Sequence, residues 1–582
     1  MLSPADLTTL IIYFLLIIGV GVVLSKKASG SISDYYLGGR TIPWYILGIS
    51  GMATFLSLSG SMHVASLYLI LGVKGFLTTF RGHLALVLAF LMIFVAKWLN
   101  RSGVMTNAEW IEFRFGRDRQ GRLARFLAAL SNTIVSVSIM AFFFVAAEKF
   151  FALYLPFNPK IGAIIFFAAV MVYTVSSGFY GVVYTDLIQS VLMFGVIVFF
   201  AVKAIAVGTP DYYARFTTAD WHSLTPSWRM EMPEGYESME MFGLLVIFWI
   251  LSSVLQGFAI PTDGFISQRY YAAKNERESA LVAWQWIALL SLRFLMMTAV
   301  AVLALGITDT FNDPEKAFPA VIDYYIPGGF KGLVLAGLIA AEMSSLDSIA
   351  NSSAAYIVKD IYQEFIRPGA ERRELMKLSY ISTAALFVLS VVMGLTIPNL
   401  NSLWAWIIMG LVTGMLPPNA LKWFWWRFNG LGYAFGMVTG IIAAVLHSLV
   451  FDGAPEYITF MFVLAISTVG SIAGTFIGDA PDREVLNRFF RKTKPFGFWE
   501  SVRRELPDDF VTEVRRENRR DILLIAPACL WQIVLFWSMS ALVVKKWWSF
   551  SISMCLVGIL SYILYKWWYR NLKCDDDNGS DT

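Results

Sequence analysis

The chain has 582 residues, of which 57% are hydrophobic and only 15% are charged, and its mean hydropathy is +0.61. This composition excludes a soluble globular protein of this size and predicts a polytopic membrane protein. The net charge of +4 gives no sign of nucleic-acid binding, and three cysteines near the C-terminus predict neither a disulfide framework nor a metal site.

Apolar stretches of about 20 residues, about fifteen of them, recur along the chain, and each is long enough to cross roughly 30 Å of hydrocarbon. The first, Leu7 to Leu24, is followed rather than preceded by basic residues, so we expect a retained helix with its N-terminus outside. Counted from there, the basic loops fall on one side, which the positive-inside rule makes cytoplasmic. These loops hold Arg114, Arg117, Arg119 and Arg122, then Lys274 and Arg277, then Arg372 and Arg373. We therefore expect a multi-pass protein of the plasma (inner) membrane with a cytoplasmic C-terminus.

Two apolar segments are interrupted in similar ways. The first, residues 46–71, contains three glycines and a run of hydroxyls at Ser57, Ser59 and Ser61. The second, residues 242–270, contains Gly257, Pro261 and Gly264 around Thr262 and Asp263. Broken backbone at membrane depth is tolerated where it lines a cavity or binds a ligand. Because an odd number of helices separates the two starts, the second unit is inverted, which is typical of inverted-repeat transporters with a midplane site. Simple packing kinks are the alternative.

This reading predicts the organisation of the chain. The predicted parts are an N-terminal helix and loop (1–33), a first five-helix repeat (34–207), an external loop (208–240), a second five-helix repeat (241–428), two further helices (429–478), a basic amphipathic cytoplasmic segment (479–520), two C-terminal helices (521–567) and an acidic disordered tail (568–582). The basic segment is expected either on the headgroup layer or docked under the helix bundle.

A polar stripe interrupts the apolar segment 330–362. Its sequence is Ala341-Glu-Met-Ser344-Ser345-Leu-Asp347-Ser348, and helical spacing places its small and hydroxyl residues on one face. Uncharged oxygens of this kind would hold sodium weakly enough to release it. On the residues alone, a small-residue contact between helices explains the stripe as well.

Several motifs, taken together, resemble the sodium/solute symporter family, whose members include the sodium/glucose cotransporters. They are Tyr35-x-Leu37-Gly38-Gly39-Arg40 with Pro43-Trp44, Thr106-x-x-Glu109 with Glu112, Arg114, Phe115 and Gly116, Tyr184-Thr185-Asp186-x-x-Gln189, Gln268-Arg269-x-x-Ala272-Ala273-Lys274, and Ala341-x-x-Ser344-Ser345 with Asn351-Ser352 and Asp360-Ile361-Tyr362. The resemblance covers roughly residues 34–440. It implies an all-α fold of the leucine-transporter type: an inverted 5+5 helix bundle, with one helix before it and about four after it.

The resemblance also implies residues for sodium. The main sodium site would use the carbonyls of Ala53, Leu56 and Ala341 and the hydroxyls of Ser344 and Ser345. A possible second cation site would combine Asp186, Ser344, Asp347 and Ser348. Asp347 would there strengthen cation binding or carry a proton, unless it only makes an ion pair or hydrogen bond within the bundle. Sodium is the implied coupling ion, with no organic cofactor and no enzymatic activity.

The same resemblance places the solute beside the two breaks. The implied candidates are Ser57, Ser59, Arg81, Gln256, Thr262 and Asp263. Arg81 either faces the cavity, where it would suit an anionic solute, or extends to water at the helix end. Arg293 lies in the middle of an apolar helix and needs a partner, for which Glu342 or Asp347 is the candidate, and a structural ion pair is favoured over substrate binding.

The expected function is sodium-coupled symport of a small polar organic solute, namely a sugar, a sugar acid or a carboxylate, into the cell. The expected partners are this solute, sodium ions and membrane lipid, with no nucleic acid and with the oligomeric state left open. Proton coupling through Asp186 or Asp347 is the competitor within the same class. A transport-inactive sensor of the same fold and a membrane enzyme are the competitors outside it.

Overall fold

The structure is a computed structural model of the whole chain. It describes residues 2–28, 30–81, 85–154, 156–207, 223–232, 236–259, 264–307, 314–397, 403–404, 406–450 and 455–572. Thr262, Asp263, most of the predicted external loop at 208–240 and the end of the predicted acidic tail therefore lie outside the described residues.

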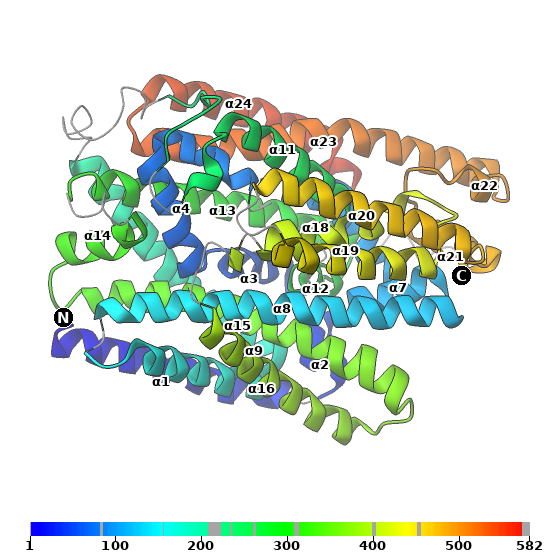
Figure 1. Cartoon of the computed structure of the whole chain (residues 1–582), viewed down its shortest axis with the longest axis horizontal. Coiled ribbons are helices and arrows are strands. Elements are labelled where there is room, and N and C mark those ends of the chain that lie inside the picture. The colour runs from blue at the N-terminus through cyan, green and yellow to red at the C-terminus, as the bar shows by residue number, and fades with distance from the viewer. Residues whose placement is uncertain are drawn as a thin grey trace.

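Within the described ranges, the chain forms helices and loops, apart from one isolated bridge between Trp425 and Phe498. Twelve of these helices are long and apolar enough to cross a membrane, or thirteen if one bent pair counts as a span. The apolar window of the central helix α15 (Lys331–Ala355) is 94% buried, whereas those of α1 (Pro4–Ala28) and α24 (Trp547–Trp567) are only 17% buried. The bundle therefore surrounds α15, and the exposed apolar faces of α1 and α24 lie at its outside (Figure 1).

The two predicted repeats account for most of the remaining elements. The first contains α3 (Trp44–Thr54), α4 (Leu58–Leu71), η2 (Gly72–Phe80), α5 (Val87–Phe90), η3 (Leu91–Val95), α6 (Ala96–Ser102), α7 (Asn107–Phe115), α8 (Arg119–Tyr154) and α9 (Pro159–Val207). The second contains α11 (Phe242–Ala259), α12 (Gly264–Ala272), α13 (Glu276–Ala304), η6 (Pro314–Lys316), α14 (Ala317–Tyr325), α15, η7 (Tyr356–Ile366), α16 (Arg372–Thr396), η8 (Trp406–Val412) and α18 (Thr413–Phe424).

The other described elements flank these two groups. They are α1, α2 (Ile32–Leu37), η1 (Gly38–Arg40), η4 (Glu237–Met239), α19 (Gly430–Val450), α20 (Glu456–Ile477), α21 (Arg483–Thr493), α22 (Glu500–Arg503), α23 (Asp508–Val543), α24 and η9 (Tyr569–Asn571). The predicted basic segment, 479–520, contains α21, α22 and the start of α23, which begins at Asp508.

Helix α9 contains two membrane spans. A straight helix of its 49 residues would be about 74 Å long, more than twice the hydrocarbon thickness. Gly178 interrupts it with φ 52° and ψ −155°, a backbone conformation that favours glycine. On either side of this glycine, Tyr173 donates to Asp347 of α15, and Asp186 lies 3.6 Å from Arg269, which itself donates to Ser348 of α15. The chain therefore turns at Gly178, which keeps the alternation of spans that the inverted repeat requires.

Helix α1 is anchored to the start of α15. The Asp6 carboxylate accepts hydrogen bonds from the backbone N–H groups of Gly332, at 2.7 Å, and Gly329, at 3.2 Å. These N–H groups have no partner within their own helix, so Asp6 caps α15 from another element.

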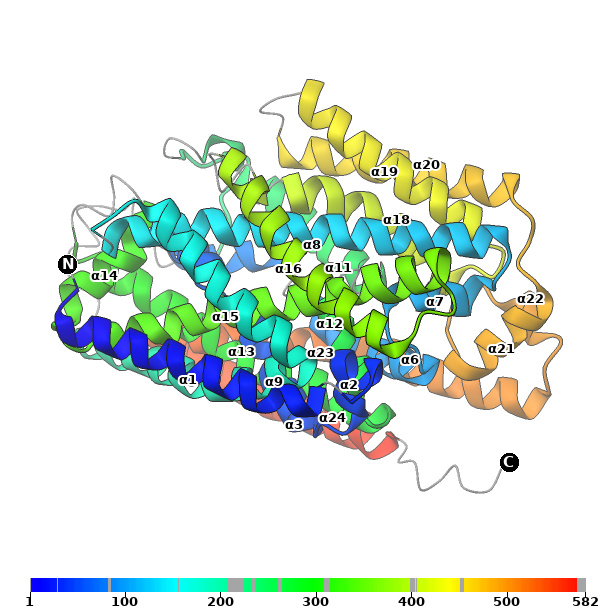
Figure 2. The same ribbon diagram turned by 90° about the horizontal axis from the view of Figure 1, so that it is seen from below.

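The elements α21 and α22 dock under the end of the bundle where α7 lies (Figure 2). The buried guanidinium of Arg114 in α7 donates to the carbonyls of Lys422, at 2.8 Å, and Trp425, at 3.0 Å, which end α18. The buried Trp499 ring lies 4.9 Å from this guanidinium, and its Nε1 donates to the Trp423 carbonyl at 2.9 Å. Of the two predicted locations for the basic segment, its first half thus takes the docked one.

The docked segment also brings basic residues close to the bundle. Burial, followed by the nearby positive charges of Arg40 and Arg488, lowers the pKa of Lys492. The Lys492 ammonium donates to the Ser102 carbonyl at 3.2 Å, at the end of α6. A cation at a helix C-terminus interacts favourably with the helix dipole, which offsets part of the cost of that burial.

Candidate functional site

The first predicted break lies between α3 and α4. Helix α3 ends at Thr54, and Ser57 caps the start of α4, its hydroxyl accepting from the Gly60 N–H at 3.3 Å. Phe55 and Leu56 lie between the helices, where the Leu56 N–H donates to the Ala53 carbonyl at 3.1 Å. The second break separates α11 from α12 at residues 260–263, which lie outside the described residues.

The polar stripe of α15 faces the first break. The Ser345 hydroxyl lies 2.7 Å from the Thr54 carbonyl and 3.1 Å from the Ala341 carbonyl. The Ser344 hydroxyl beside it is fully buried and has no hydrogen-bond partner among the described residues. The Leu56 carbonyl accepts from Ser61 at 3.1 Å. The structure thus brings Ser345 against the break at Thr54, between the predicted ligands Ala53 and Leu56, and the sodium site itself stays a prediction.

These groups suit a monovalent cation. Hard cations such as sodium prefer oxygen ligands, and the main site offers carbonyls and hydroxyls. The hydroxyl of Ser345 already lies within hydrogen-bond distance of two carbonyls, so a cation there would replace these contacts with coordination by the same oxygens. An uncharged ligand set of this kind binds weakly, which suits release in each cycle.

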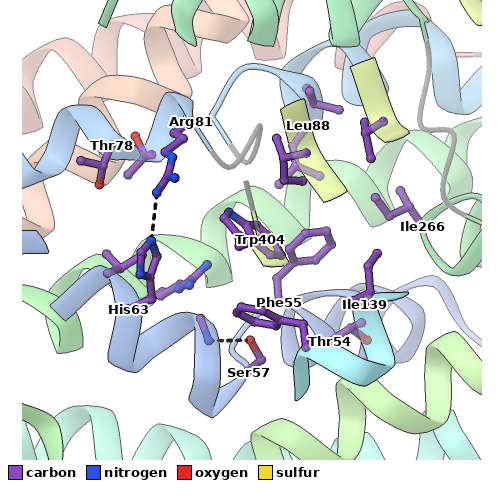
Figure 3. A pocket seen from close by; sticks show the side chains of 18 of the residues that line it. Thr54, Phe55, Ser57, His63, Thr78, Arg81, Leu88, Ile139, Ile266 and Trp404 are labelled. Carbon is purple, nitrogen blue, oxygen red and sulfur yellow. Dashed lines mark hydrogen bonds between the residues drawn. The ribbon is translucent and has the colours of Figure 1, made fainter. Parts of the chain in front are cut away.

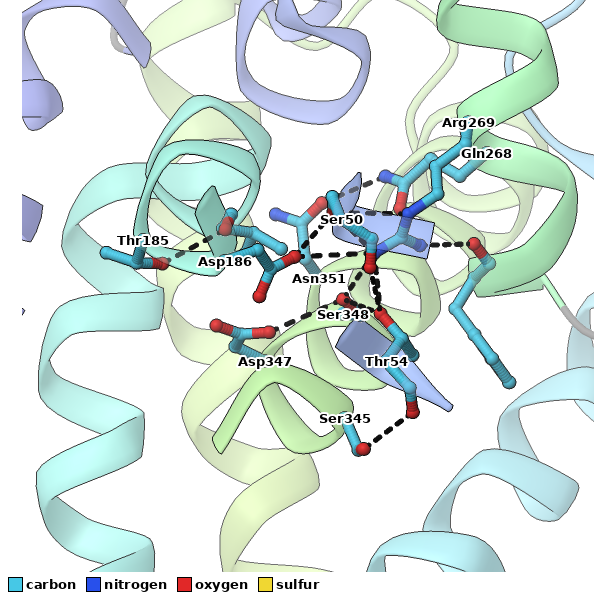
Figure 4. Close-up of polar contacts among 12 residues, drawn as sticks. Ser50, Thr54, Thr185, Asp186, Gln268, Arg269, Ser345, Asp347, Ser348 and Asn351 are labelled. Atoms are coloured by element: carbon cyan, nitrogen blue, oxygen red, sulfur yellow. Dashed lines mark hydrogen bonds and ion pairs between the residues drawn. The ribbon is translucent and has the colours of Figure 1, made fainter. Parts of the chain in front are cut away.

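A buried guanidinium lies next to this cluster (Figure 4). Arg269 Nη2 of α12 lies within hydrogen-bond distance of three hydroxyls, those of Thr54, at 2.7 Å, Ser348, at 2.8 Å, and Ser50, at 2.8 Å. The Asp186 carboxylate of α9 lies 3.6 Å from the same nitrogen and also accepts from the Ser50 hydroxyl. One arginine therefore joins both broken helices to α9 and α15.

The predicted second cation site is only partly assembled. The Asp347 carboxylate accepts from the Tyr173 hydroxyl at 2.7 Å and lies 3.4 Å from the Ser348 hydroxyl. Asp186 Oδ1 is buried without a hydrogen-bond partner among the described residues. Because Arg269 already binds Asp186 and Ser348, its guanidinium takes the place of a cation at that end of the cluster.

Sequence reasoning assigned no role to Arg269, Ser50, Thr54 or Tyr173. A signal for Arg269 was present, because a charged residue inside an interrupted apolar segment is rarely without function. Thr54 lies between the predicted ligands Ala53 and Leu56. Ser50 and Tyr173 carry no comparable signal in the sequence.

A cavity of about 180 Å³ lies beside the first break (Figure 3). For comparison, an apolar cavity of about 150 Å³ accommodates benzene, so one small six-membered ring fits here. Aromatic and aliphatic side chains form most of its wall. The polar side chains of the lining are Thr54, Ser57, His63, Thr78, Thr79, Arg81, Gln256 and Arg293. Three candidates, Ser57, Arg81 and Gln256, thus line the cavity, and the Gln256 amide nitrogen is buried with no partner among the described residues.

Arg81 lines the cavity but has an acidic partner. It is nearly fully buried, so it does not extend to water. Its guanidinium contacts the Glu456 carboxylate of α20 through two nitrogens, with Nε at 3.1 Å from Oε2. Its third nitrogen lies 3.2 Å from His63 Nε2 (Figure 3). Glu456 lies outside the ten-helix core, which is why reasoning about the core did not anticipate this pair.

Arg293 does not pair with Glu342 or Asp347, so the structure does not form the ion pair favoured from the sequence. The Glu342 carboxylate instead accepts from the Ser59 N–H at 3.2 Å and the Ser59 hydroxyl at 3.0 Å, while Asp347 accepts from Tyr173. This contact also keeps Ser59 out of the cavity lining. Arg293 lines the cavity with 5% of its surface exposed and makes no ion pair or hydrogen bond within the described ranges.

Three kinds of comparison place the chain among known proteins. A family model described as "Sodium:solute symporter family" matches residues 35–440, which include both broken helices and α15. Sodium/glucose cotransporter 4 of Danio rerio is 27% identical over 493 residues, covering 77% of this chain and 72% of that protein. The sodium/glucose cotransporter of Vibrio parahaemolyticus is 26% identical and covers 79% of this chain and 87% of that protein. The human sodium/myo-inositol cotransporter is 27% identical, covering 78% and 68%.

A solved structure shares the fold. It is described as the substrate-bound outward-open state of a Na+-coupled sialic acid symporter, and it superposes with a TM-score of 0.68. It covers 82% of this chain and 99% of its own, at 20% sequence identity. At that identity the likeness is one of fold, an inverted-repeat bundle of the leucine-transporter type with additional helices.

Proposed function

Because this chain belongs to the sodium:solute symporter family, we propose that it uses inward movement of sodium to drive uptake of a small polar organic solute by alternating access. The observation that carries the proposal is the contact of the Ser345 hydroxyl with the Thr54 carbonyl at the first break. The solute occupies the cavity on the other side of that break, where Ser57 and Gln256 offer polar groups. The solute is a sugar, a sugar acid or another carboxylate, taken up across the plasma membrane.

Sodium at this position would couple to solute binding through the break itself. The ion bridges α15 and the unwound end of α3, so it fixes the residues that follow, of which Phe55 and Ser57 line the cavity. A ligand that favours one arrangement of the break raises the affinity for a second ligand that needs the same arrangement. Each inward positive charge gains about 2.3 kcal/mol per 100 mV, which corresponds to roughly fifty-fold accumulation of a neutral solute.

Uptake into liposomes tests the proposed coupling. The purified protein is reconstituted, and a panel of radiolabelled sugars, sugar acids and carboxylates is offered under an inward sodium gradient with pH clamped. We expect accumulation of at least one solute, lost when potassium replaces sodium. Accumulation driven by a proton gradient without sodium would contradict sodium coupling and would favour the carboxylates of Asp186 and Asp347 as proton carriers.

A second sodium at Asp186, Ser344, Asp347 and Ser348 needs a rearrangement first. The Arg269 guanidinium must leave Ser348 or Asp186 before a cation can use their oxygens. We therefore propose the main site as the coupling site. We expect the second to bind sodium only in states where Arg269 has moved.

A further inference from the structure

We infer that the solute is an anion whose carboxylate binds the guanidinium of Arg293. This inference rests on the proposed function and names the class of solute that the same cavity takes. It follows from a comparison of the charges and hydrogen-bonding groups that line the cavity.

The first step is the charge of the lining. The titratable side chains among its described residues are His63, Arg81 and Arg293, and none of these is an acid. Glu456 contacts two nitrogens of Arg81 from outside the lining and matches its charge. His63 Nε2 faces the third nitrogen of Arg81, which can only donate, so this ring nitrogen is the acceptor. Arg293 is then the one described lining residue with an unmatched positive charge.

The second step is the position of Arg293. Its side chain is buried, and Nε has no partner among the described residues. A Cβ placed on Gly60 would lie 3.0 Å from Arg293 Nη2 and 2.8 Å from the Ser57 hydroxyl. The guanidinium therefore lies directly against the start of α4, where the proposed solute binds, and Gly60 leaves it room.

The third step is the kind of group that lacks a partner. Arg293 has only donors, and the Gln256 amide nitrogen, which is also a donor, is buried without a partner in the described part of the chain. A ligand that satisfies both must be rich in acceptors. A carboxylate has two acceptor oxygens and matches the planar guanidinium through two parallel hydrogen bonds, which a sugar hydroxyl cannot do. The apolar wall of the cavity then contacts the body of the solute.

Matched pairs of probes test the inference. Thermal unfolding of the purified full-length protein is measured in sodium with D-galactose and D-galacturonate, with D-glucose and D-glucuronate, and with acetate, lactate and benzoate. We expect at least one carboxylate to raise the unfolding temperature, and each neutral sugar to do so less than its uronate. Stabilisation by a neutral sugar equal to or above that of its uronate, or stabilisation by none of the carboxylates, would overturn the inference.

Variants then assign the effect to one residue. In Arg293→Gln we expect the apparent affinity for the stabilising carboxylate to fall about 10- to 100-fold, because charge-assisted hydrogen bonds are lost. Arg293→Lys keeps the charge, so its affinity for the carboxylate should fall less. It replaces Arg293→Gln as the test variant if that protein does not fold. Arg229→Gln removes a charge from a side chain that is 75% exposed and should leave the affinity unchanged. Equal carboxylate affinity in Arg293→Gln and the parent chain would refute the assignment.

The outcomes separate this inference from the proposed function. Sodium-dependent uptake of a neutral sugar only would leave the symport proposal intact and refute the anionic solute. Carboxylate binding that depends on Arg293 but is indifferent to sodium would support the anionic solute and would contradict sodium coupling.

Discussion

Arg81 and Arg293 line the same cavity, but only Arg81 has a carboxylate partner among the described residues. Glu456 contacts Arg81 through two nitrogens, whereas Arg293 makes no ion pair among the described residues. An unpaired arginine near the bilayer centre costs at least about 2.5 kcal/mol. Loss of Glu456 would therefore leave the charge of Arg81 uncompensated, and in our proposal the solute anion offsets the cost of Arg293.

The buried pair predicts the effect of removing its acid. Glu456→Gln leaves the charge of Arg81 buried without compensation, so we expect a loss of about 3 to 5 kcal/mol in the free energy of unfolding. Denaturant unfolding of the purified protein measures it. Glu240→Gln, which removes an exposed partner of Arg229, should cost less than about 1 kcal/mol. If Glu456→Gln and Glu240→Gln lose the same free energy of unfolding, a group other than Glu456 must compensate the charge of Arg81, and the prediction is wrong.

At the scale of single elements, two features that do not line the cavity hold helices of the bundle in place. They are the turn in α9 and the docked segment that contains α21 and α22. The turn at Gly178 places Tyr173 and Asp186 on the same stripe of α15. The docked segment ties α7 to the end of α18 through Arg114 and Trp499. Neither element lines the cavity, so changes in them should alter stability before they alter solute binding.

Gly178 should not tolerate a side chain. An added Cβ would lie 2.7 Å from the Tyr35 carbonyl, and the positive φ alone costs an alanine about 1 kcal/mol or more. We expect Gly178→Ala to lower the unfolding temperature in a thermal melt. Gly195→Ala is the matched control in the same helix, since nothing lies within 4 Å of its added Cβ. A Gly178→Ala protein as stable as the control would contradict a turn at this position.

Trp499 should control the docking of α21 and α22. Removal of a fully buried tryptophan costs about 3 to 5 kcal/mol, so amide hydrogen exchange in α21 should accelerate about 100-fold or more in Trp499→Ala. Hydrogen exchange read by mass spectrometry resolves this helix. Trp548→Ala, at a side chain that is 81% exposed, is the control and should leave exchange in α21 unchanged. Protection in α21 that survives the loss of Trp499 would mean that the segment docks by other contacts.

At the scale of the molecule, apolar length and interruption predicted the all-helical membrane fold and the first break. The Ser345 hydroxyl contacts the Thr54 carbonyl, which lies between the predicted ligands Ala53 and Leu56, and the sodium site stays a prediction. The sequence alone could not predict which residues pair with the buried charges of Arg81 and Arg269. Arg81 and Glu456 are 375 residues apart, and Arg269 reaches three helices, so each contact depends on how distant helices rotate against one another.

The charge of the solute also sets how the whole molecule responds to voltage. One sodium carried with one monoanion moves no net charge, so the membrane potential adds nothing to accumulation. A neutral solute, or a second sodium per anion, would restore that contribution. Arg269 contacts Asp186 and Ser348 of the predicted second cation site, so its position would decide whether a second sodium contributes to transport.

Sodium binding at the break is the central claim, and a sodium titration of thermal stability tests it most directly. At constant ionic strength, sodium replacing potassium should stabilise the protein, by about 2.7 kcal/mol when it reaches 100 times its dissociation constant. Ser345→Ala should need about ten-fold more sodium for the same shift, because it loses one ligand oxygen. Ser352→Ala, whose hydroxyl bonds only within α15, should titrate like the parent protein. An unchanged titration in Ser345→Ala would contradict the account.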